Sequence, residues 1–243
     1  MKILYLLLIA WVVLIIVLRA DVVAAWARIQ WQRGNSEKAL KAYAFADKIG
    51  KMSADSCFAY GYIALRHGDT EIARRVLTRA SMSNPKPPVK KRIKSMLALL
   101  EWKEGNLPLA IEMLEEIIED FKTTEIYQDL GLMYILSGDK EKALKFNLEA
   151  YDYNSDNMGI MDNLAQSYIL CGEQEKASEV YEELLEKEPH FPEPYYEYGA
   201  MLVEKGERER GIDLIRTSLD KRFTFLSVKT KNEIKQLLAR YEG

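Results

Sequence analysis

The chain is poor in the residues that enzymes most often use for nucleophilic, acid–base or metal chemistry. Its 243 residues include two cysteines, Cys57 and Cys171, and two histidines, His67 and His190, which are isolated in the sequence. No CxxC pair is present, which excludes a zinc ribbon. The sequence also lacks GxGxxG, GxxxxGK[ST], HExxH and GxSxG. We therefore expect no enzyme activity, no metal site, no cofactor and no small-molecule substrate.

Signals for β-structure are lacking as well. Apolar residues recur at helical spacing, as in IYQDLGLMYILS over residues 126–137 and KEKALKFNLEAY over residues 140–151. Glycine and proline lie between such stretches, and no alternation of strands with helices is visible. The sequence therefore predicts an all-α protein.

One short pattern recurs along most of the chain. Residues 135–144 read ILSGDKEKAL, and residues 169–178, which begin 34 positions later, read ILCGEQEKAS. Six glycines share this pattern at spacings of 34, 37, 33, 34 and 34, and each is followed five positions later by Ala or Gly. They are Gly34, Gly68, Gly105, Gly138, Gly172 and Gly206. A period near 34 indicates stacked helix–turn–helix units, with glycine at the turn and residues such as Asp139 capping the second helix.

This pattern resembles the tetratricopeptide repeat family. Counted from the glycine, the family's Leu-Gly step falls on Leu130-Gly131, Leu164-Ala165 and Tyr198-Gly199, and its closing proline on Pro85 and Pro189. The resemblance implies a right-handed α-solenoid of about six units. The predicted domains are a transmembrane anchor at 1–19, repeats at about 20–53, 54–90, 91–123, 124–157, 158–191 and 192–225, and a capping helix at 226–243.

The resemblance also implies a groove, lined by the first helix of each pair, that binds a protein or peptide partner. The predicted groove residues are Phe58, Tyr62, Leu99, Gln128, Leu132, Asp162, Gln166 and Tyr196. Family members that clamp a peptide carboxylate use Lys, Asn and Arg, which are replaced here by Gln and Asp. The predicted groove is apolar with an acidic side, which favours a partner segment with apolar anchors and basic flanks. For the apolar residues nearest each turn, packing between neighbouring helices is an equal alternative.

Charge is distributed unevenly along the chain. Residues 1–100 contain 17 Lys or Arg and only 6 Asp or Glu, whereas residues 101–200 contain 7 and 24. The stretch NPKPPVKKRIK predicts a proline-rich basic loop between the second and third repeats. Its candidates for contact with lipid headgroups are Lys86, Lys90, Lys91, Arg92 and Lys94. The alternative is a solvated loop that absorbs three extra residues. No stacking platform or motif accompanies these residues, so we expect no nucleic-acid partner.

Residues 3–18 form an unbroken apolar run. As a helix the run spans about 24 Å, slightly less than the roughly 30 Å hydrocarbon core of a bilayer. It predicts a single-pass anchor in the cell membrane, and the alternative is a cleaved signal peptide. The excess of Lys and Arg after the run predicts that the repeats face the cytoplasm. The predicted function is a membrane-anchored adaptor. An extracytoplasmic repeat protein for envelope or secretion assembly is the alternative.

Overall fold

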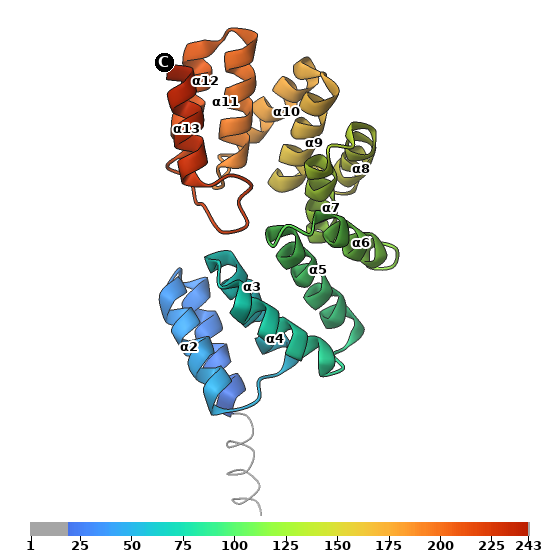
Figure 1. Cartoon of the computed structure of the whole chain (residues 1–243), viewed down its shortest axis with the longest axis vertical. Helices are drawn as coiled ribbons and strands as arrows, with labels where there is room; N and C mark the ends of the chain where they lie inside the picture. Colours follow the sequence, from blue (N-terminus) through green and yellow to red (C-terminus); the bar gives the residue numbers. More distant parts are fainter. Residues whose placement is uncertain (1–18, 243) are drawn as a thin grey trace, which may run out of the picture. The chain divides into compact units, whose positions relative to one another are not determined.

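A computed structural model describes residues 19–242 (Figure 1). Within this range the regular secondary structure is helical and no strand is present, which confirms the predicted all-α class. The apolar run at residues 3–18, on which the predicted anchor rests, lies outside the described residues. Among the residues that are described, no helix has both the length and the apolar character needed to cross a membrane.

The chain divides into two compact units, Met1–Leu100 and Glu101–Gly243, and α5 runs across the division. The first unit, unit 1, contains a helix over residues 19–32, α2 (Ser36–Ile49), α3 (Ala54–His67), α4 (Thr70–Met82) and most of α5 (Pro87–Lys103). The second, unit 2, contains the end of α5, α6 (Leu107–Ile118), α7 (Thr124–Ser137), α8 (Lys140–Tyr153), α9 (Met158–Cys171), α10 (Gln174–Glu186), α11 (Glu193–Lys205), α12 (Arg208–Ser218) and α13 (Lys231–Glu242).

Consecutive helices pair as the repeat pattern predicts. Helix α3 packs on α4, α7 on α8, α9 on α10, and α11 on α12. All six glycines of the repeat have a positive φ, between 78° and 96°, which side chains with a Cβ rarely adopt. After Gly138, the Asp139 side chain accepts a hydrogen bond from the backbone N–H of Lys142 at 3.1 Å. This bond caps the start of α8, as the sequence predicts.

Helix α5 differs from the sequence-based prediction. The prediction of a proline-rich loop over residues 84–94 is wrong, because α5 begins at Pro87 and includes Lys90 to Lys94. Proline is favourable in the first turn of a helix, where a backbone N–H has no partner within the helix. Helix α5 has 17 residues, whereas α3, α7 and α9 have 14 each. The three extra residues of this repeat therefore lengthen its first helix.

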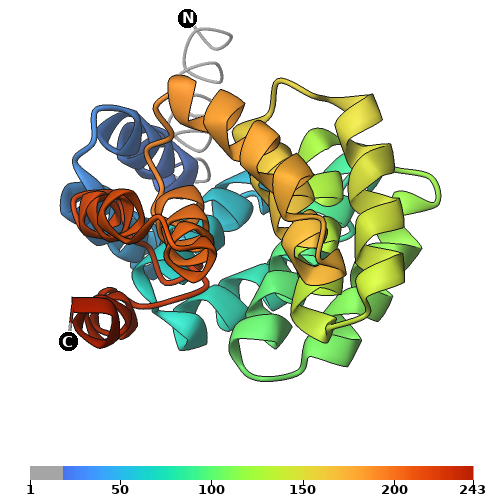
Figure 2. The same cartoon turned by 90° about the horizontal axis from the view of Figure 1, so that it is seen from above.

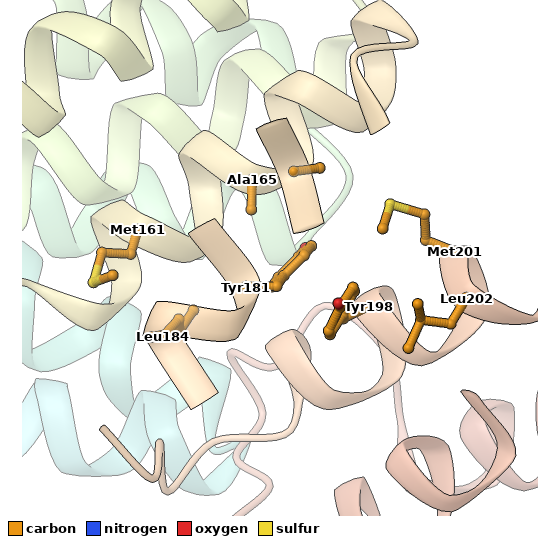
Figure 3. Packing of buried hydrophobic residues seen from close by; sticks show 8 residues of the cluster. Met161, Ala165, Tyr181, Leu184, Tyr198, Met201 and Leu202 are labelled. Carbon is orange, nitrogen blue, oxygen red and sulfur yellow. The ribbon is translucent and has the colours of Figure 1, made fainter. Parts of the chain in front are cut away.

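One core cluster of unit 2 joins α9, α10 and α11 (Figure 3). The rings of Tyr181 and Tyr198 stack with their centroids 5.1 Å apart and 19° between their planes. The other members of the cluster are Met161, Ala165, Ala177, Leu184, Met201 and Leu202. Ala177 is fully buried, which agrees with the prediction that a small residue lies there because the paired helices approach closely.

Helix α13 covers the last helix pair. Ile234 is fully buried and packs in a cluster with Tyr196 of α11 and Ile215 of α12. The helix lies beside α12 at the C-terminal end of the chain (Figure 2). Although the sequence pattern predicts a helix from residue 226, α13 begins at Lys231. Residues 219–230, which join α12 to α13, form an irregular segment that we call the C-terminal strap.

Candidate functional site

Unit 2 contains five of the eight predicted groove residues, all on the first helices of three successive pairs. They are Gln128 and Leu132 on α7, Asp162 and Gln166 on α9, and Tyr196 on α11. Gln128 and Leu132 are half-buried, whereas the predicted exposure of the others is wrong, because Asp162, Gln166 and Tyr196 are buried. We call this set of five residues the candidate face. Helix α9 contacts both α7 and α11, so the three helices lie in sequence across the unit.

The residues of the candidate face on α7 and α9 are linked closely. The carbonyl oxygen of Gln128 accepts a hydrogen bond of 2.8 Å from Nδ2 of Asn163. The side chain of Gln128 lies against Gly159, where an added Cβ would be 2.3 Å from the Gln128 amide carbon. Nε2 of Gln166 donates to Oδ2 of Asp162 at 2.8 Å. Gln128 therefore contacts the first half of α9 through Asn163 and Gly159, while Asp162 and Gln166 form a pair of their own within α9.

An acidic cluster forms where α9 meets α11. Asp162 is only 4% exposed and Glu193 only 8%. Burial raises the pKa of Asp162 well above its ordinary value, and the carboxylates of Glu193 and Glu197 raise it further. Burial also raises the pKa of Glu193. Carboxylates in such an environment favour a nearby cation, because a positive charge stabilises their ionised form.

One buried polar atom of this region has no hydrogen-bond partner. It is Oδ1 of Asp162, a residue that is only 4% exposed. Burying a polar group without a partner costs free energy, and most buried polar groups in native proteins are paired. This atom therefore indicates capacity for an additional hydrogen bond on the candidate face.

The C-terminal strap supplies the cation that the cluster favours. Nζ of Lys229 lies 2.5 Å from Oε1 of Glu197 and 4.4 Å from the ring centroid of Tyr196. The backbone N–H of Val228 donates to Oε1 of Glu193 at 3.0 Å. In Figure 1 the strap leaves the end of α12, turns away from the last helix pair and returns to α13.

A third carboxyl group with a raised pKa lies on α7. Burial raises the pKa of Asp129 to about 7, and the neighbouring Glu125 carboxylate adds to the rise. Asp129 directly follows Gln128 and occupies the same repeat position as Asn163 and Glu197.

This repeat position, nine residues before the glycine, was missed by the sequence reasoning, which considered the positions ten, six and three residues before it. The signal was present in the sequence, because this position is Asp, Asn or Glu in each of the last three repeats.

The remaining three predicted groove residues lie in unit 1. Phe58 is half-buried beneath the guanidinium of Arg92, which lies 4.3 Å from its ring centroid. The hydroxyl of Tyr62 accepts a hydrogen bond of 3.0 Å from Nη1 of Arg66, and its ring meets Trp31 edge-on. Leu99 is only 5% exposed, so its side chain is part of the core of unit 1.

Four of the five basic candidates for lipid contact lie near the start of α5, and Lys86 lies just before it. Lys86, Lys90 and Arg92 are exposed, while Lys91 and Lys94 are half-buried. The cation–π contact of Arg92 with Phe58 joins α5 to α3 within unit 1. As for metals, the described residues include no group of three or more His, Cys, Asp or Glu side chains that could hold an ion.

Stacked helix pairs with a glycine at each turn define a helical repeat protein of the solenoid class. The chain matches family models described as tetratricopeptide repeat over residues 58–123, 124–157 and 159–190, together more than half of its length. It belongs to the tetratricopeptide repeat family. Helical repeats of this class present extended surfaces that bind proteins, and the chain is a scaffold of this general kind.

Proteins similar to the chain carry the same repeats. It is 32% identical over 92 residues to TPR repeat-containing protein MJ1428 of Methanocaldococcus jannaschii, and 31% identical over 127 residues to TPR repeat-containing protein YvcD of Bacillus subtilis. These matches cover 37% and 52% of the chain, but only 16% and 25% of the two relatives. A tetratricopeptide repeat protein from Parabacteroides merdae superposes with a TM-score of 0.74 over 93% of this chain and 85% of that protein, at 16% identity. At this identity the likeness shows the fold alone.

Proposed function

We propose that this chain is a membrane-anchored, non-catalytic adaptor that holds a partner protein on the candidate face of unit 2. The bound segment has apolar anchors and basic flanks. The observation that carries the proposal is the acidic cluster on α9 and α11, where buried Asp162 keeps one carboxyl oxygen without a partner. A charged group buried in this way is costly unless a cation or a donor meets it.

An apolar contact accompanies the acidic cluster. Leu132 on α7 is half-buried, although Leu130 and Met133 on the same helix are fully buried. Leu132 occupies the repeat position of Gln166, so it lies on the same face as the polar residues of the next repeat. A partner segment that spans α7 and α11 would therefore contact the apolar side chain of Leu132 on α7 and the carboxylates of Glu193 and Glu197 on α11.

The membrane part of the proposal rests on sequence. The apolar run at residues 3–18 has the composition of a single membrane span, and Arg19, Arg28, Arg33 and Lys38 follow it. An excess of basic residues on one side of a span favours the cytoplasmic side. The basic residues at the start of α5 then face an anionic membrane leaflet, which attracts such charges.

Paired substitutions test binding to the candidate face. We expect Leu132→Glu to leave the thermal melt nearly unchanged, because surface substitutions typically change stability by less than about 0.5 kcal/mol. The same variant should lose the partner in a crosslinked pulldown from membranes. Leu148→Glu on α8 is the matched control, because Leu148 is exposed on the second helix of the same pair. It should fold and still capture the partner.

Leu130→Glu provides the opposite control, since it places an unpaired charge at a fully buried position and should unfold the repeats. Capture of the same partner by a folded Leu132→Glu protein would rule out the candidate face as the binding surface. A Leu132→Glu protein that melts as low as Leu130→Glu would place Leu132 in the core.

A further inference from the structure

The C-terminal strap covers part of the candidate face of its own unit. Its Lys229 ammonium lies over the Tyr196 ring and forms an ion pair with Glu197. One residue earlier, the backbone N–H of Val228 donates to the carboxylate of Glu193. These contacts occupy the carboxylates that the proposed function assigns to a partner.

A lysine that is distant in the sequence contacts the middle of the strap. Nζ of Lys103 donates a hydrogen bond of 3.1 Å to the carbonyl oxygen of Ser227 and lies 5.0 Å from the ring centroid of Phe225. Lys103 is the last residue of α5 and lies 124 residues before Ser227 in the sequence. The strap therefore extends from α11 to the first helix of the third repeat.

The strap has a packed part and a surface part. Leu219 and Phe223 pack against the cluster of Tyr196, Ile215 and Ile234, whereas none of residues 224–230 is fully buried or belongs to that cluster. Residues 224–230 can therefore detach while the start of the strap and both neighbouring helices stay packed. The strap's contacts with Glu193, Glu197 and Lys103 are polar, and contacts of this kind exchange for equivalent ones from another chain at little cost.

The fit between the strap and the carboxylates is incomplete. Asp162, Glu193 and Glu197 lie around a single strap lysine, and Oδ1 of Asp162 remains without a partner. A ligand with more hydrogen-bond donors than Lys229 would satisfy this atom. An arginine, which has five N–H donors in a planar fork, matches this arrangement of carboxylates.

We propose that the strap is an internal placeholder, and that the partner is a basic peptide segment with apolar neighbours that displaces it. The partner's arginine or lysine takes the place of Lys229, and its main chain replaces the Val228 contact with Glu193. The strap thereby keeps the face closed to weaker ligands. This inference rests on the proposed function, because it specifies the ligand of the same face.

The test uses the full chain and a peptide of residues 223–231, FTFLSVKTK, labelled with fluorescein as the probe. Lys229→Glu places a carboxylate beside Glu197 and should release the strap. We expect the Kd of this variant for the probe to be at least about tenfold lower than that of the wild type, because the tethered competitor no longer binds. Lys231→Glu is the matched control, since Lys231 is exposed at the start of α13. It should bind the probe as weakly as the wild type.

Two further measurements distinguish release of the strap from an effect of the substitution on folding. Phe225→Ala removes the ring beneath Lys103 without changing charge, and it should also strengthen probe binding. Hydrogen exchange at the Val228 amide should be faster in both variants, and in the wild type with excess unlabelled peptide. A probe in which Lys229 is replaced by Glu should bind none of the proteins.

If neither Lys229→Glu nor Phe225→Ala binds the probe more tightly than the wild type, the strap is a fixed part of the fold and the inference is overturned. That outcome leaves the proposed function standing as long as Leu132→Glu still abolishes partner capture, because the probe experiment requires no partner. Loss of the proposed function would instead appear as a folded Leu132→Glu protein that captures its partner normally.

Discussion

The main chains of α11 and α12 come into direct contact at Gly199 and Gly211. A Cβ added to Gly211 would lie 2.4 Å from the carbonyl oxygen of Gly199, and one added to Gly199 would lie 2.6 Å from the carbonyl oxygen of Gly211. In the other five repeats the position of Gly211 is alanine. The two helices of the last pair therefore pack backbone against backbone at these two glycines.

This relationship predicts that Gly211→Ala destabilises the protein, although alanine is the residue that the other repeats use. The gain in helix propensity is about 1 kcal/mol, and overpacking typically costs about 1–3 kcal/mol. Because the obstacle is backbone, we expect the cost to dominate and the melting temperature to fall. Glu209→Ala, at an exposed position of the same helix, should change the melt little. An unchanged or higher melting temperature for Gly211→Ala would contradict the close approach.

Gly131 presents a different case, because its obstacle is a side chain. A Cβ added there would lie 2.0 Å from Oδ1 of Asn147, which is fully buried. Nδ2 of Asn147 donates to the Gly131 carbonyl at 3.2 Å and to Oγ of Ser167 at 2.9 Å. We expect Gly131→Ala to be strongly destabilising in the wild type and much less so in an Asn147→Ala background.

A double-mutant cycle from denaturant unfolding measures this coupling, which should be about 0.5–3 kcal/mol. Additive effects of Gly131→Ala and Asn147→Ala would show that the two positions do not meet. The result also distinguishes this pair from Gly199 and Gly211, where no side chain can be removed to relieve the clash.

Stability should depend on pH through Asp129. Its pKa is about 7 in the folded protein, against an ordinary value of 3.8. Between these values the folded state binds more protons than the unfolded state, so the free energy of unfolding falls as pH rises. Over pH 6 to 8 the melting temperature should therefore decrease, with the loss complete above the folded pKa. The raised pKa values of Asp162 and Glu193 act in the same direction.

Asp129→Asn should therefore reduce this dependence and raise the melting temperature at pH 8, while exposed Asp152→Asn should do neither. Carboxyls with lowered pKa values, such as Asp47 and Glu115, act in the opposite direction, but only in more acidic solutions. Melts at several pH values decide the matter, and parallel profiles for Asp129→Asn and the wild type would exclude Asp129 as the cause.

The proposed topology has a direct test in cells. The excess of Lys and Arg after residue 18 predicts that the C-terminus is cytoplasmic. Alkaline phosphatase fused after Gly243 should be inactive, while a fluorescent protein at the same position should mature. An active phosphatase fusion in intact cells would favour the alternative of an extracytoplasmic protein for envelope or secretion assembly.

Much of the fold could be predicted because its signals are local. A glycine with positive φ and a small residue five positions later act over a few residues, so they recur visibly in the sequence. The predicted cap after the glycine is confirmed at Asp139. It is wrong in the other five repeats, where no side-chain capping hydrogen bond is formed by Asn35, Asp69, Asn106, Glu173 and Glu207. The start of α5 was mispredicted because Pro87 and Pro88 suggest a break, although proline is compatible with the first helical turn.

The candidate site was less accessible, because it depends on contacts between distant segments. The positions of Asp162 and Gln166 on the first helix of their repeat could be predicted from the register alone, and their role in binding stays a prediction. The role of Lys229 could not, since the segment 226–238 has helical spacing and the strap emerges only when α13 begins at Lys231. The contact between Lys103 and Ser227 joins residues that no repeat pattern relates.

The strap is tied at both ends to packed helices, so it never diffuses away from its carboxylates. A segment tethered over such a short distance has a local concentration on the order of millimolar. A partner that arrives from solution at micromolar concentration therefore competes at a large numerical disadvantage. A partner that presents several basic segments at once competes with the strap on equal terms. Occupancy of the face would then depend on the local density of basic segments more than on the total amount of partner.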